Sequence, residues 1–362
     1  MSDRVSVNRI LLVLLVLMVC LLLRSTLLRA STRPRLSVSQ EHAAEAHDVV
    51  PVVICASEER MGASMATINS IISNTDASVF FYVVTLRDAV KLTRCIFELQ
   101  KYEPHFVPNM EISGFLPVLL PKIHLDPISY IPSCLKEIKN FVLQLNFVRF
   151  YLPLLDILHS RVIYLDDDII VQGDIRDLFN IKLKPGHAAA FATDCDLPST
   201  HETVRSIGMQ TTYMGFLDYR KQEVKDLGIN PSDCSFNPGV FVADMNEWKK
   251  QKVTKELEKW MEENFRQNIY SSAMAGGVAT PPMLIVFHDK YTILDPLWHV
   301  RHLGWSPDVH YPENFLQEAH LLHWNGPFKP WNYPAVHLDR WEKWFIPDPS
   351  GRFSWERPDD DS

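Results

Sequence analysis

The chain has 362 residues, of which 46% are hydrophobic and 22% are charged, and its formal net charge is −8. This composition is that of a globular protein with enough length to bury a core in one large domain or two smaller ones. The acidic balance leaves no overall basic excess to hold a nucleic-acid backbone, so we expect no nucleic-acid partner.

The N-terminal segment differs from the rest of the chain in composition. Residues 10–23 form an unbroken apolar run with arginines on both sides. A membrane-spanning helix needs roughly 17–25 residues, and continuation to Leu28 approaches this length if Arg24 extends its charge toward the membrane surface. Because no small-x-small cleavage site directly follows, we expect a signal-anchor. The alternative is a cleaved signal peptide, which the run also fits.

The signal-anchor divides the chain into five parts and makes the protein a single-pass type II membrane protein with its globular domain in the lumen. The expected parts are a cytoplasmic tail (1–9), a transmembrane helix (10–28), a luminal stem (29–48), a globular domain (49–350) and a mobile tail (351–362).

Five cysteines lie beyond the apolar run, and in an oxidising lumen they can pair. Cys195 and Cys234 both flank candidate site motifs, so they are the pair to test first. The alternative is that all five are buried thiols.

The globular part opens with a β–α–β pattern. Residues 49–57 and 77–86 predict strands, and residues 62–75 have the apolar spacing of a helix. Such a unit indicates a mainly parallel sheet in an α/β domain. Ligands of these sheets lie beyond the carboxyl ends of the strands, so Ala56, Ser57 and Glu58 should face a ligand crevice.

Further elements follow along the chain. Residues 145–155 predict a helix that carries Arg149 among apolar neighbours. Residues 186–196 and 239–244 predict strands, and residues 249–265 predict an amphipathic helix.

Three consecutive aspartates lie between two apolar strands in the sequence VIYLDDDIIVQGD (162–174). On an extended strand Asp166 and Asp168 point to the same side, so both can reach one cation, whereas Asp167 points elsewhere. Two hard oxygen ligands suit Mg²⁺, Mn²⁺ or Ca²⁺, and such an ion offsets the repulsion between the carboxylates. The alternatives are a solvated acidic turn or the cap of a following helix.

A candidate third ligand, His323, lies in the sequence HLLHWNGPFKPW (320–331). A neutral imidazole suits Mn²⁺ or another transition metal, although a single histidine is more often structural. In the same segment Gly326 permits close backbone approach, and Lys329 offers a cation for a diphosphate bound to the same ion.

Three motifs in this order and spacing resemble those of glycosyltransferase family 8: VIYLDDDIIVQGD, CSFNPGVFVADMNEW (234–248) and HWNGPFKPW (323–331). The resemblance covers roughly residues 50–350 and is greatest to the animal members. It implies a GT-A fold, a UDP-sugar donor, Mn²⁺ dependence, retention of anomeric configuration, and a location in the Golgi or endoplasmic reticulum.

The resemblance also implies roles for single residues. Asp166 and Asp168 match the metal-binding D-x-D, and His323 matches the third metal ligand. Asp167, the intervening position, is expected near the nucleoside or a neighbouring side chain rather than on the metal. The remaining matches are Ala56 and Ser57 beside the uridine, Arg149 near the phosphate and donor sugar, Asp194 and Asn237 at sugar hydroxyls, and Gly326 and Lys329 in the loop that closes on the diphosphate.

Four of these residues are the predicted catalytic residues: Arg149, Asp194, Asn237 and Lys329. Each of the first three also has a structural interpretation. Arg149 could belong to a core ion pair, Asp194 could pair with a local Arg or Lys, and Asn237 could shape the turn before Pro238.

One departure from the family pattern bears on mechanism. Family members such as glycogenin carry an Asp-Gln pair under the reacting sugar carbon, whereas residues 276–288 contain no acid or amide before Asp289. We therefore expect a retaining, UDP-sugar-dependent hexosyltransferase-type enzyme that uses a front-face mechanism on an unidentified glycan, protein or lipid acceptor. The alternative is a weakly active or inactive protein of the same fold that binds UDP and metal as a scaffold.

Overall fold

The computed structural model describes residues 49–85, 115–119 (backbone only), 145–155, 157–195, 213–270, 279–308, 310–332, 334–347 and 353–354. The chain separates into two units, Met1–Asp48 and Val49–Ser362, and every described residue belongs to the second. The predicted tail, transmembrane helix and stem therefore lie outside the described residues. Within the part that is described, none of the helices combines the length and the hydropathy needed to cross a membrane.

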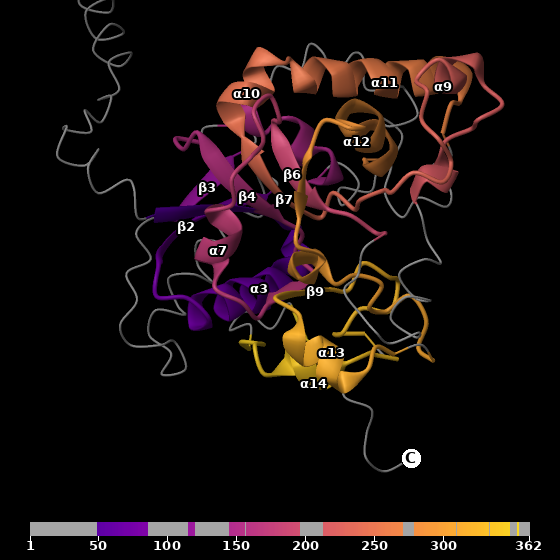
Figure 1. Cartoon of the computed structure of the whole chain (residues 1–362). Helices are drawn as coiled ribbons and strands as arrows, with labels where there is room; N and C mark the ends of the chain where they lie inside the picture. Colours follow the sequence, from indigo (N-terminus) through magenta and orange to yellow (C-terminus); the bar gives the residue numbers. More distant parts are fainter. Residues whose placement is uncertain are drawn as a thin grey trace, which may run out of the picture. The chain divides into compact units, whose positions relative to one another are not determined.

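A mixed sheet lies at the centre of the second unit, with seven strands among the described residues in the order β3-β2-β1-β4-β7-β6-β8 (Figure 1). β1 pairs in parallel with β2 and β4, β2 with β3, and β6 with β8, whereas β7 is antiparallel to both its neighbours. The predicted mainly parallel sheet is thus confirmed. The strands are β1 (Val49–Cys55), β2 (Ser78–Thr85), β3 (Phe115–Leu119), β4 (Arg161–Leu165), β6 (Ala189–Ala192), β7 (Val240–Asp244) and β8 (Thr292–Leu294).

Apolar side chains alternate between the two faces of β1, so each face has its own core. Val52 and Ile54 pack with residues of α3 (Met61–Ser73) and α7 (Ile175–Phe179). Val53 and Cys55 belong to the core on the other face, which α10 (Met245–Lys250), α11 (Val253–Gln267) and α12 (Thr280–Phe287) cover. Figure 1 shows these three helices above the sheet and α3 and α7 below it. This layering is what the period-2 alternation of a buried strand requires.

The predicted helix over 62–75 is confirmed by α3, whose small residues allow close packing. A side-chain carbon at Gly62 would lie 2.1 Å from the ring of Phe353. Phe353 is buried, so the chain still packs on the domain at this position.

Two predicted helices differ from the structure. The helix expected over 249–265 is divided between α10 and α11, because Lys252 adopts a left-handed conformation with φ of 56°. The helix expected over 145–155 is wrong in form: the segment contains two short 3₁₀ helices, Val148–Phe150 and Leu152–Leu154. Pro153 has no backbone N–H with which to continue an α-helix through this point.

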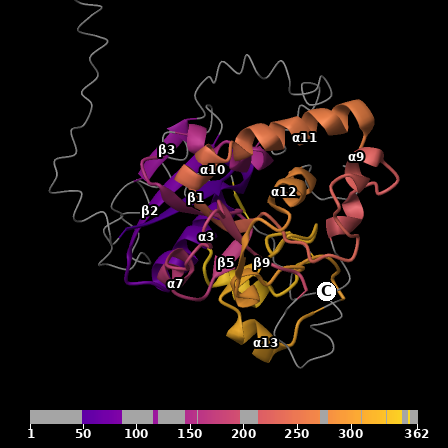
Figure 2. The same ribbon diagram turned by 45° about the horizontal axis from the view of Figure 1, so that its top comes forward.

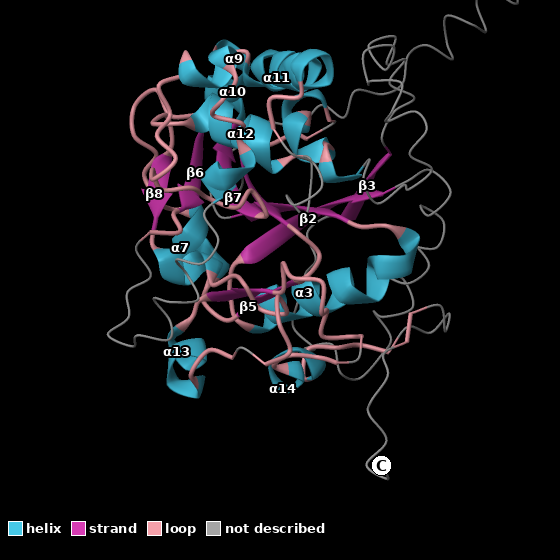
Figure 3. Ribbon diagram, turned by 90° about the vertical axis from the view of Figure 1, so that its right-hand side faces the viewer, coloured by secondary structure: helices cyan, strands magenta, loops and turns pink. Residues whose placement is uncertain are grey.

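A second, two-stranded sheet joins distant parts of the chain. β5 (Ile169–Val171) pairs antiparallel with β9 (Leu321–His323), and Ile169 is opposite His323. Figure 2 shows the two strands side by side next to α3. In Figure 3 the strand β5 lies along α3, where Thr67 Oγ1 donates a hydrogen bond to the Ile169 carbonyl at 2.7 Å. This pairing brings the aspartate triplet and the histidine motif together.

The remaining short elements surround this framework. They include α9 (Gln222–Lys225), α13 (Glu313–Glu318), α14 (Leu338–Glu342) and the 3₁₀ helices Glu58–Arg60, Tyr213–Phe216 and Pro296–His299.

Candidate active site

A cavity of about 460 Å³ opens at the carboxyl ends of β1 and β4. This is the edge at which parallel sheets bind ligands. Nine of the predicted site residues line it: Ser57, Arg149, Asp166, Asp167, Asp168, Asn237, His323, Gly326 and Lys329. Ala56 and Asp194, the two remaining predicted residues, are buried and are not part of this lining.

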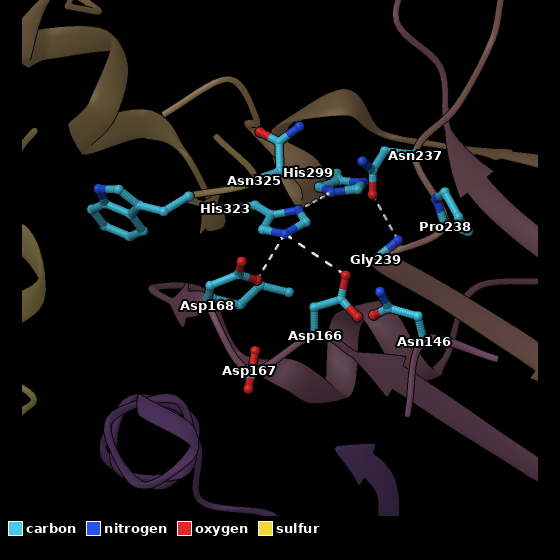
Figure 4. A network of polar contacts seen from close by, with 12 residues as sticks. Asn146, Asp166, Asp167, Asp168, Asn237, Pro238, Gly239, His299, His323 and Asn325 are labelled. Atoms are coloured by element: carbon cyan, nitrogen blue, oxygen red, sulfur yellow. Dashed lines mark hydrogen bonds and ion pairs between the residues drawn. The ribbon is translucent and has the colours of Figure 1, made fainter. Parts of the chain in front are cut away.

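Asp166, Asp168 and His323 form one cluster, and each offers a ligand atom within 4.8 Å of the others. The Nε2 atom of His323 lies 2.9 Å from Asp168 Oδ1 and 3.9 Å from Asp166 Oδ2 (Figure 4). Its Nδ1 atom is 2.8 Å from Nε2 of His299. Because His299 occupies one ring nitrogen, the other is the nitrogen directed at both carboxylates, as a histidine metal ligand requires.

This donor set fits a divalent cation. Two carboxylates and an imidazole suit Mn²⁺ and related ions better than Ca²⁺, which prefers oxygen alone. The β5–β9 pairing places His323 next to Asp168, and the Asp166 N–H donates to the Gly239 carbonyl at 2.8 Å. The backbone therefore fixes all three side chains in position.

Gly239 allows the cluster to close. A side-chain carbon at this position would lie 2.5 Å from His323 Cε1, 2.6 Å from Asp166 Oδ2 and 2.8 Å from Asn237 Oδ1. All three distances are shorter than atomic contact allows, so any larger residue would displace a ligand side chain.

Three cationic side chains surround the aspartates. Arg149 Nη2 lies 2.9 Å from Asp166, and Arg60 Nη2 lies 2.7 Å from Asp167 and 3.3 Å from Asp168. The ammonium of Lys329 contacts Asp168 Oδ2 and the backbone carbonyl of residue 324. These three cations balance the three carboxylates, so a bound divalent cation would leave this edge positively charged and suited to a polyanionic ligand.

The environments of the two buried aspartates differ. Burial raises the pKa of Asp167 to about 7, although Arg60 opposes the shift. Burial alone would also raise the pKa of Asp168, but Lys329 and His323 hold it well below its usual value. Asp168 is therefore ionised, and Asp167 points away from His323 toward Arg60 (Figure 4). The structure thus separates Asp167 from the other two carboxylates, and its predicted place near the nucleoside stays a prediction.

Arg149 makes contacts that position the site. Its guanidinium donates to the carbonyls of Asn146 at 2.8 Å and Pro238 at 2.7 Å, as well as to Asp166. Arg149 therefore forms an ion pair with Asp166, as the structural interpretation expected, but this pair lies at the cavity wall. Its predicted contact with phosphate and sugar stays a prediction.

Asp194 holds the segment that leads to Asn237. Its carboxylate accepts hydrogen bonds from the backbone N–H and the hydroxyl of Ser235, and Arg301 Nη2 lies 3.5 Å away. The contact with Arg301 agrees with the alternative that Asp194 pairs with an Arg or Lys. The role of Asp194 at sugar hydroxyls stays a prediction. A disulfide between Cys195 and Cys234, with Cα atoms 5.5 Å apart, fixes the same junction.

The predicted Cys195–Cys234 pair is therefore present. Cys55, a free cysteine, is buried. Cys95 and Cys134 lie outside the described residues.

Of the two residues predicted beside the uridine at the end of β1, Ser57 lines the cavity and Ala56 does not. The hydroxyl of Ser57 is buried at the cavity wall and has no hydrogen-bond partner among the described residues. Ala56 is fully buried, and its N–H donates to the Val84 carbonyl at 3.0 Å. Its predicted place beside the uridine stays a prediction.

Gly326 permits a close approach between two loops. A side-chain carbon there would lie 2.1 Å from the carbonyl oxygen of Gly304, and Gly304 has φ of +72°. This contact holds the loop that carries Lys329 over the cavity.

The residues at the site that were not predicted from sequence include Arg60, Tyr213, His299 and Asn325. Asn325 lies inside the HWNGPFKPW motif, which could have indicated it. The other three lie outside the motifs, and only their spatial positions reveal them.

A family model, Glycosyl transferase family 8, matches residues 51–335. The chain belongs to this family. Glycosyltransferase 8 domain-containing protein 2 of Bos taurus is 54% identical over 98% of each chain, and that of Mus musculus is 55% identical over 96% of this chain and 97% of its own. Protein 1 of Mus musculus is 46% identical over 88% of this chain and 83% of its own. The expected similarity to these animal proteins, to protein 2 above all, is confirmed.

Solved structures support the fold. The galactosyltransferase LgtC, in complex with donor and acceptor sugar analogues, has a TM-score of 0.56 and 13% identity over 84% of this chain and 100% of its own. The glycosyltransferase GlyE of Streptococcus pneumoniae TIGR4 has a TM-score of 0.52 and 16% identity over 84% of this chain and 62% of its own. The family-8 chain therefore has a glycosyltransferase fold of the GT-A type, with a mainly parallel, mixed central sheet.

Proposed function

We propose that this family-8 glycosyltransferase transfers a sugar from a UDP-sugar to an acceptor hydroxyl with retention of configuration. The observation that carries the proposal is the cluster of Asp166, Asp168 and His323 within 4.8 Å, with Lys329 and Arg60 beside it in one cavity. A divalent-cation site next to two cationic side chains suits a diphosphate ester.

Asp166, Asp168 and His323 would hold Mn²⁺, which when bound neutralises charge on the diphosphate oxygens. Lys329 is directed at the same place: two of its three N–H donors are used by Asp168 and the carbonyl of residue 324, and one remains for a phosphate oxygen. Removing a preorganised contact of this kind typically raises the barrier by about 2.7–4 kcal/mol.

The front-face route fits the chemistry of the cavity wall. Ala279 and Thr280 line the cavity at the start of α12, and neither is a carboxylate or an amide that could attack the sugar carbon. In the proposed step the bond from the sugar carbon to the phosphate oxygen breaks as the acceptor oxygen bonds to the same face. The acceptor proton passes to the departing phosphate oxygen, so no enzyme base is required.

We also propose that residues 10–28 anchor the protein as a type II membrane protein, with the catalytic unit in the lumen of the Golgi or endoplasmic reticulum. The apolar run and the disulfide between Cys195 and Cys234 support this location. Retention of the full-length protein in membranes after carbonate extraction, with protease protection of the catalytic unit in sealed vesicles, is the expected result. Release by carbonate would contradict the anchor.

The decisive experiment measures UDP binding by calorimetry with and without Mn²⁺, followed by UDP release from a panel of UDP-sugars. Asp168→Asn and His323→Gln should remove the effect of Mn²⁺ on UDP affinity. Asp177→Asn and His310→Gln are matched controls, because both residues are exposed and lie outside the cavity. They should leave UDP binding unchanged.

Each outcome has a distinct meaning. Equal UDP affinity with Mn²⁺ and with EDTA would refute the metal site. Metal-dependent binding without release from any UDP-sugar and acceptor would favour the scaffold alternative over the transferase.

A further inference from the structure

Tyr213 is a buried residue that the mechanism above does not use, although it lines the cavity. It begins a 3₁₀ helix, Tyr213–Phe216, and its side chain is almost completely enclosed. Its hydroxyl is hydrogen-bonded to asparagines from two of the sequence motifs. Asn237 Nδ2 lies 3.0 Å from the phenol oxygen, and Asn325 Nδ2 lies 2.9 Å from it.

The direction of these two hydrogen bonds is fixed by the backbone. Asn237 Oδ1 accepts from the N–H of Gly239 at 2.7 Å, and Asn325 Oδ1 accepts from the N–H of His302 at 2.7 Å. A backbone N–H can only donate, so the atom that it contacts in each side-chain amide must be the oxygen. The two Nδ2 groups must consequently be the atoms that face Tyr213, and both must donate to it.

A phenol oxygen has two acceptor positions and one proton to donate. Both acceptor positions of Tyr213 are filled by amide N–H groups, so its own O–H must act as a donor. No described residue accepts this proton. Burial raises the pKa of Tyr213, although Arg301 opposes the shift, so the phenol keeps its proton at neutral pH. The Arg301 guanidinium lies 5.5 Å from the centre of the ring, where its charge polarises the phenol.

The position of this donor relative to the metal cluster indicates what it meets. Gly239 touches both the cluster and Asn237, so the Tyr213 side of the cavity adjoins Asp166 and His323. Asp168 faces the opposite cations, Lys329 and Arg60. Asp167, which is expected near the nucleoside, pairs with Arg60 on that opposite side. A diphosphate held by the cluster and Lys329 would therefore extend toward Tyr213 with its sugar end.

We propose that the Tyr213 hydroxyl donates a hydrogen bond to a hydroxyl oxygen of the sugar being transferred, and so selects the donor sugar. This inference rests on the proposed function. An uncharged donor fits a sugar hydroxyl, whereas the phosphates are already faced by cations. Asn237 and Asn325 act through Tyr213 as positioning residues, because each uses an Nδ2–H group to hold its hydroxyl oxygen.

The test uses full-length protein in Mn²⁺ and measures the dissociation constants of UDP and of UDP-glucose, UDP-galactose, UDP-xylose and UDP-glucuronate. Tyr213→Phe removes the donor and keeps the ring. Tyr311→Phe is the matched control: its hydroxyl is also buried, and it donates to the Arg301 carbonyl at 2.9 Å, outside the cavity lining. Thermal unfolding of both variants monitors the fold.

We expect Tyr213→Phe to weaken the best-bound UDP-sugar by about 3- to 10-fold, the range for one neutral hydrogen bond, while UDP itself binds as before. Tyr311→Phe should change neither constant. A series of monodeoxy analogues of that UDP-sugar gives an independent readout. One analogue should bind wild type more weakly by the same factor and should bind Tyr213→Phe as well as the parent sugar nucleotide does.

Three results would overturn the inference. The first is an unchanged affinity of Tyr213→Phe for UDP-sugars, and the second is a loss of UDP affinity as large as the loss for UDP-sugars. The third is that every deoxy analogue differs from the parent sugar nucleotide in affinity by the same factor in the variant as in wild type. Each of these leaves metal-dependent UDP binding by wild type intact. A wild-type protein that binds no UDP in Mn²⁺ would instead refute the proposed function and this inference together.

Discussion

Replacement of Gly239 by alanine should damage the metal cluster without unfolding the protein. Gly239 does not have the positive φ that would favour glycine. Alanine is therefore compatible with its backbone, and the only cost is the space that the added methyl group requires. That space is already occupied by His323, Asp166 and Asn237.

The size of the effect follows from the distances. The methyl carbon would lie 2.5 Å from His323 Cε1 and 2.6 Å from Asp166 Oδ2, whereas uncrowded contacts begin near 3.4 Å. The two ligand side chains must therefore move apart by about 0.8–0.9 Å. Because a misplacement of about 1 Å can cost 100-fold in a preorganised site, we expect a loss of Mn²⁺ affinity of about 10- to 100-fold.

The assay is a titration of Mn²⁺ followed by electron paramagnetic resonance, with UDP binding measured in parallel. Gly215→Ala is the control, because a carbon added at Gly215 meets no atom within 4 Å. It should bind Mn²⁺ and UDP like wild type. If Gly239→Ala also binds Mn²⁺ with wild-type affinity, the cluster of Asp166, Asp168 and His323 is not the metal site.

Three further predictions concern stability. Gly62→Ala should lower the free energy of unfolding by about 1–3 kcal/mol through overpacking against Phe353, and a melting temperature equal to or above wild type in calorimetry would contradict this. Asp174 accepts a hydrogen bond from the N–H of residue 176 and so caps α7; hydrogen bonds from the arginine side chain there lower its pKa to about 2. Since the folded pKa lies below the unfolded value near 3.9, this stabilisation is present above pH 4 and is lost as the pH falls toward 2. In urea titrations the advantage of wild type over Asp174→Asn should fall by roughly half between pH 5 and pH 3, and a constant difference would refute the assignment. Reduction of the Cys195–Cys234 disulfide, or replacement of both cysteines by serine, should destabilise the protein by about 2–4 kcal/mol; unchanged denaturation after confirmed reduction would show that the bond contributes nothing.

Local patterns determined much of the fold. The strands β1 and β2 and the helix α3 follow from apolar spacing, since a buried strand and a buried helix each impose a fixed period on the chain. The helix over 145–155 was predicted wrongly, because the same apolar spacing also fits successive 3₁₀ turns around Pro153. Periodicity alone cannot separate these two conformations.

The site shows the same division. The sequence by itself determined which residues are chemically suited to a cation and a diphosphate: Asp166, Asp168, His323 and Lys329. Carboxylates next to buried strands and a histidine in a glycine-containing motif are local features, so they are visible without a structure.

Only the tertiary structure decided how these residues meet. The pairing of Ile169 with His323 spans 154 positions (323 − 169) and is set by backbone hydrogen bonds between β5 and β9. Arg60 and Tyr213 carry no local signal, because their roles depend on which distant side chains lie within hydrogen-bond reach. A sequence motif specifies chemistry, whereas the register between remote strands and the packing at Gly239 specify geometry.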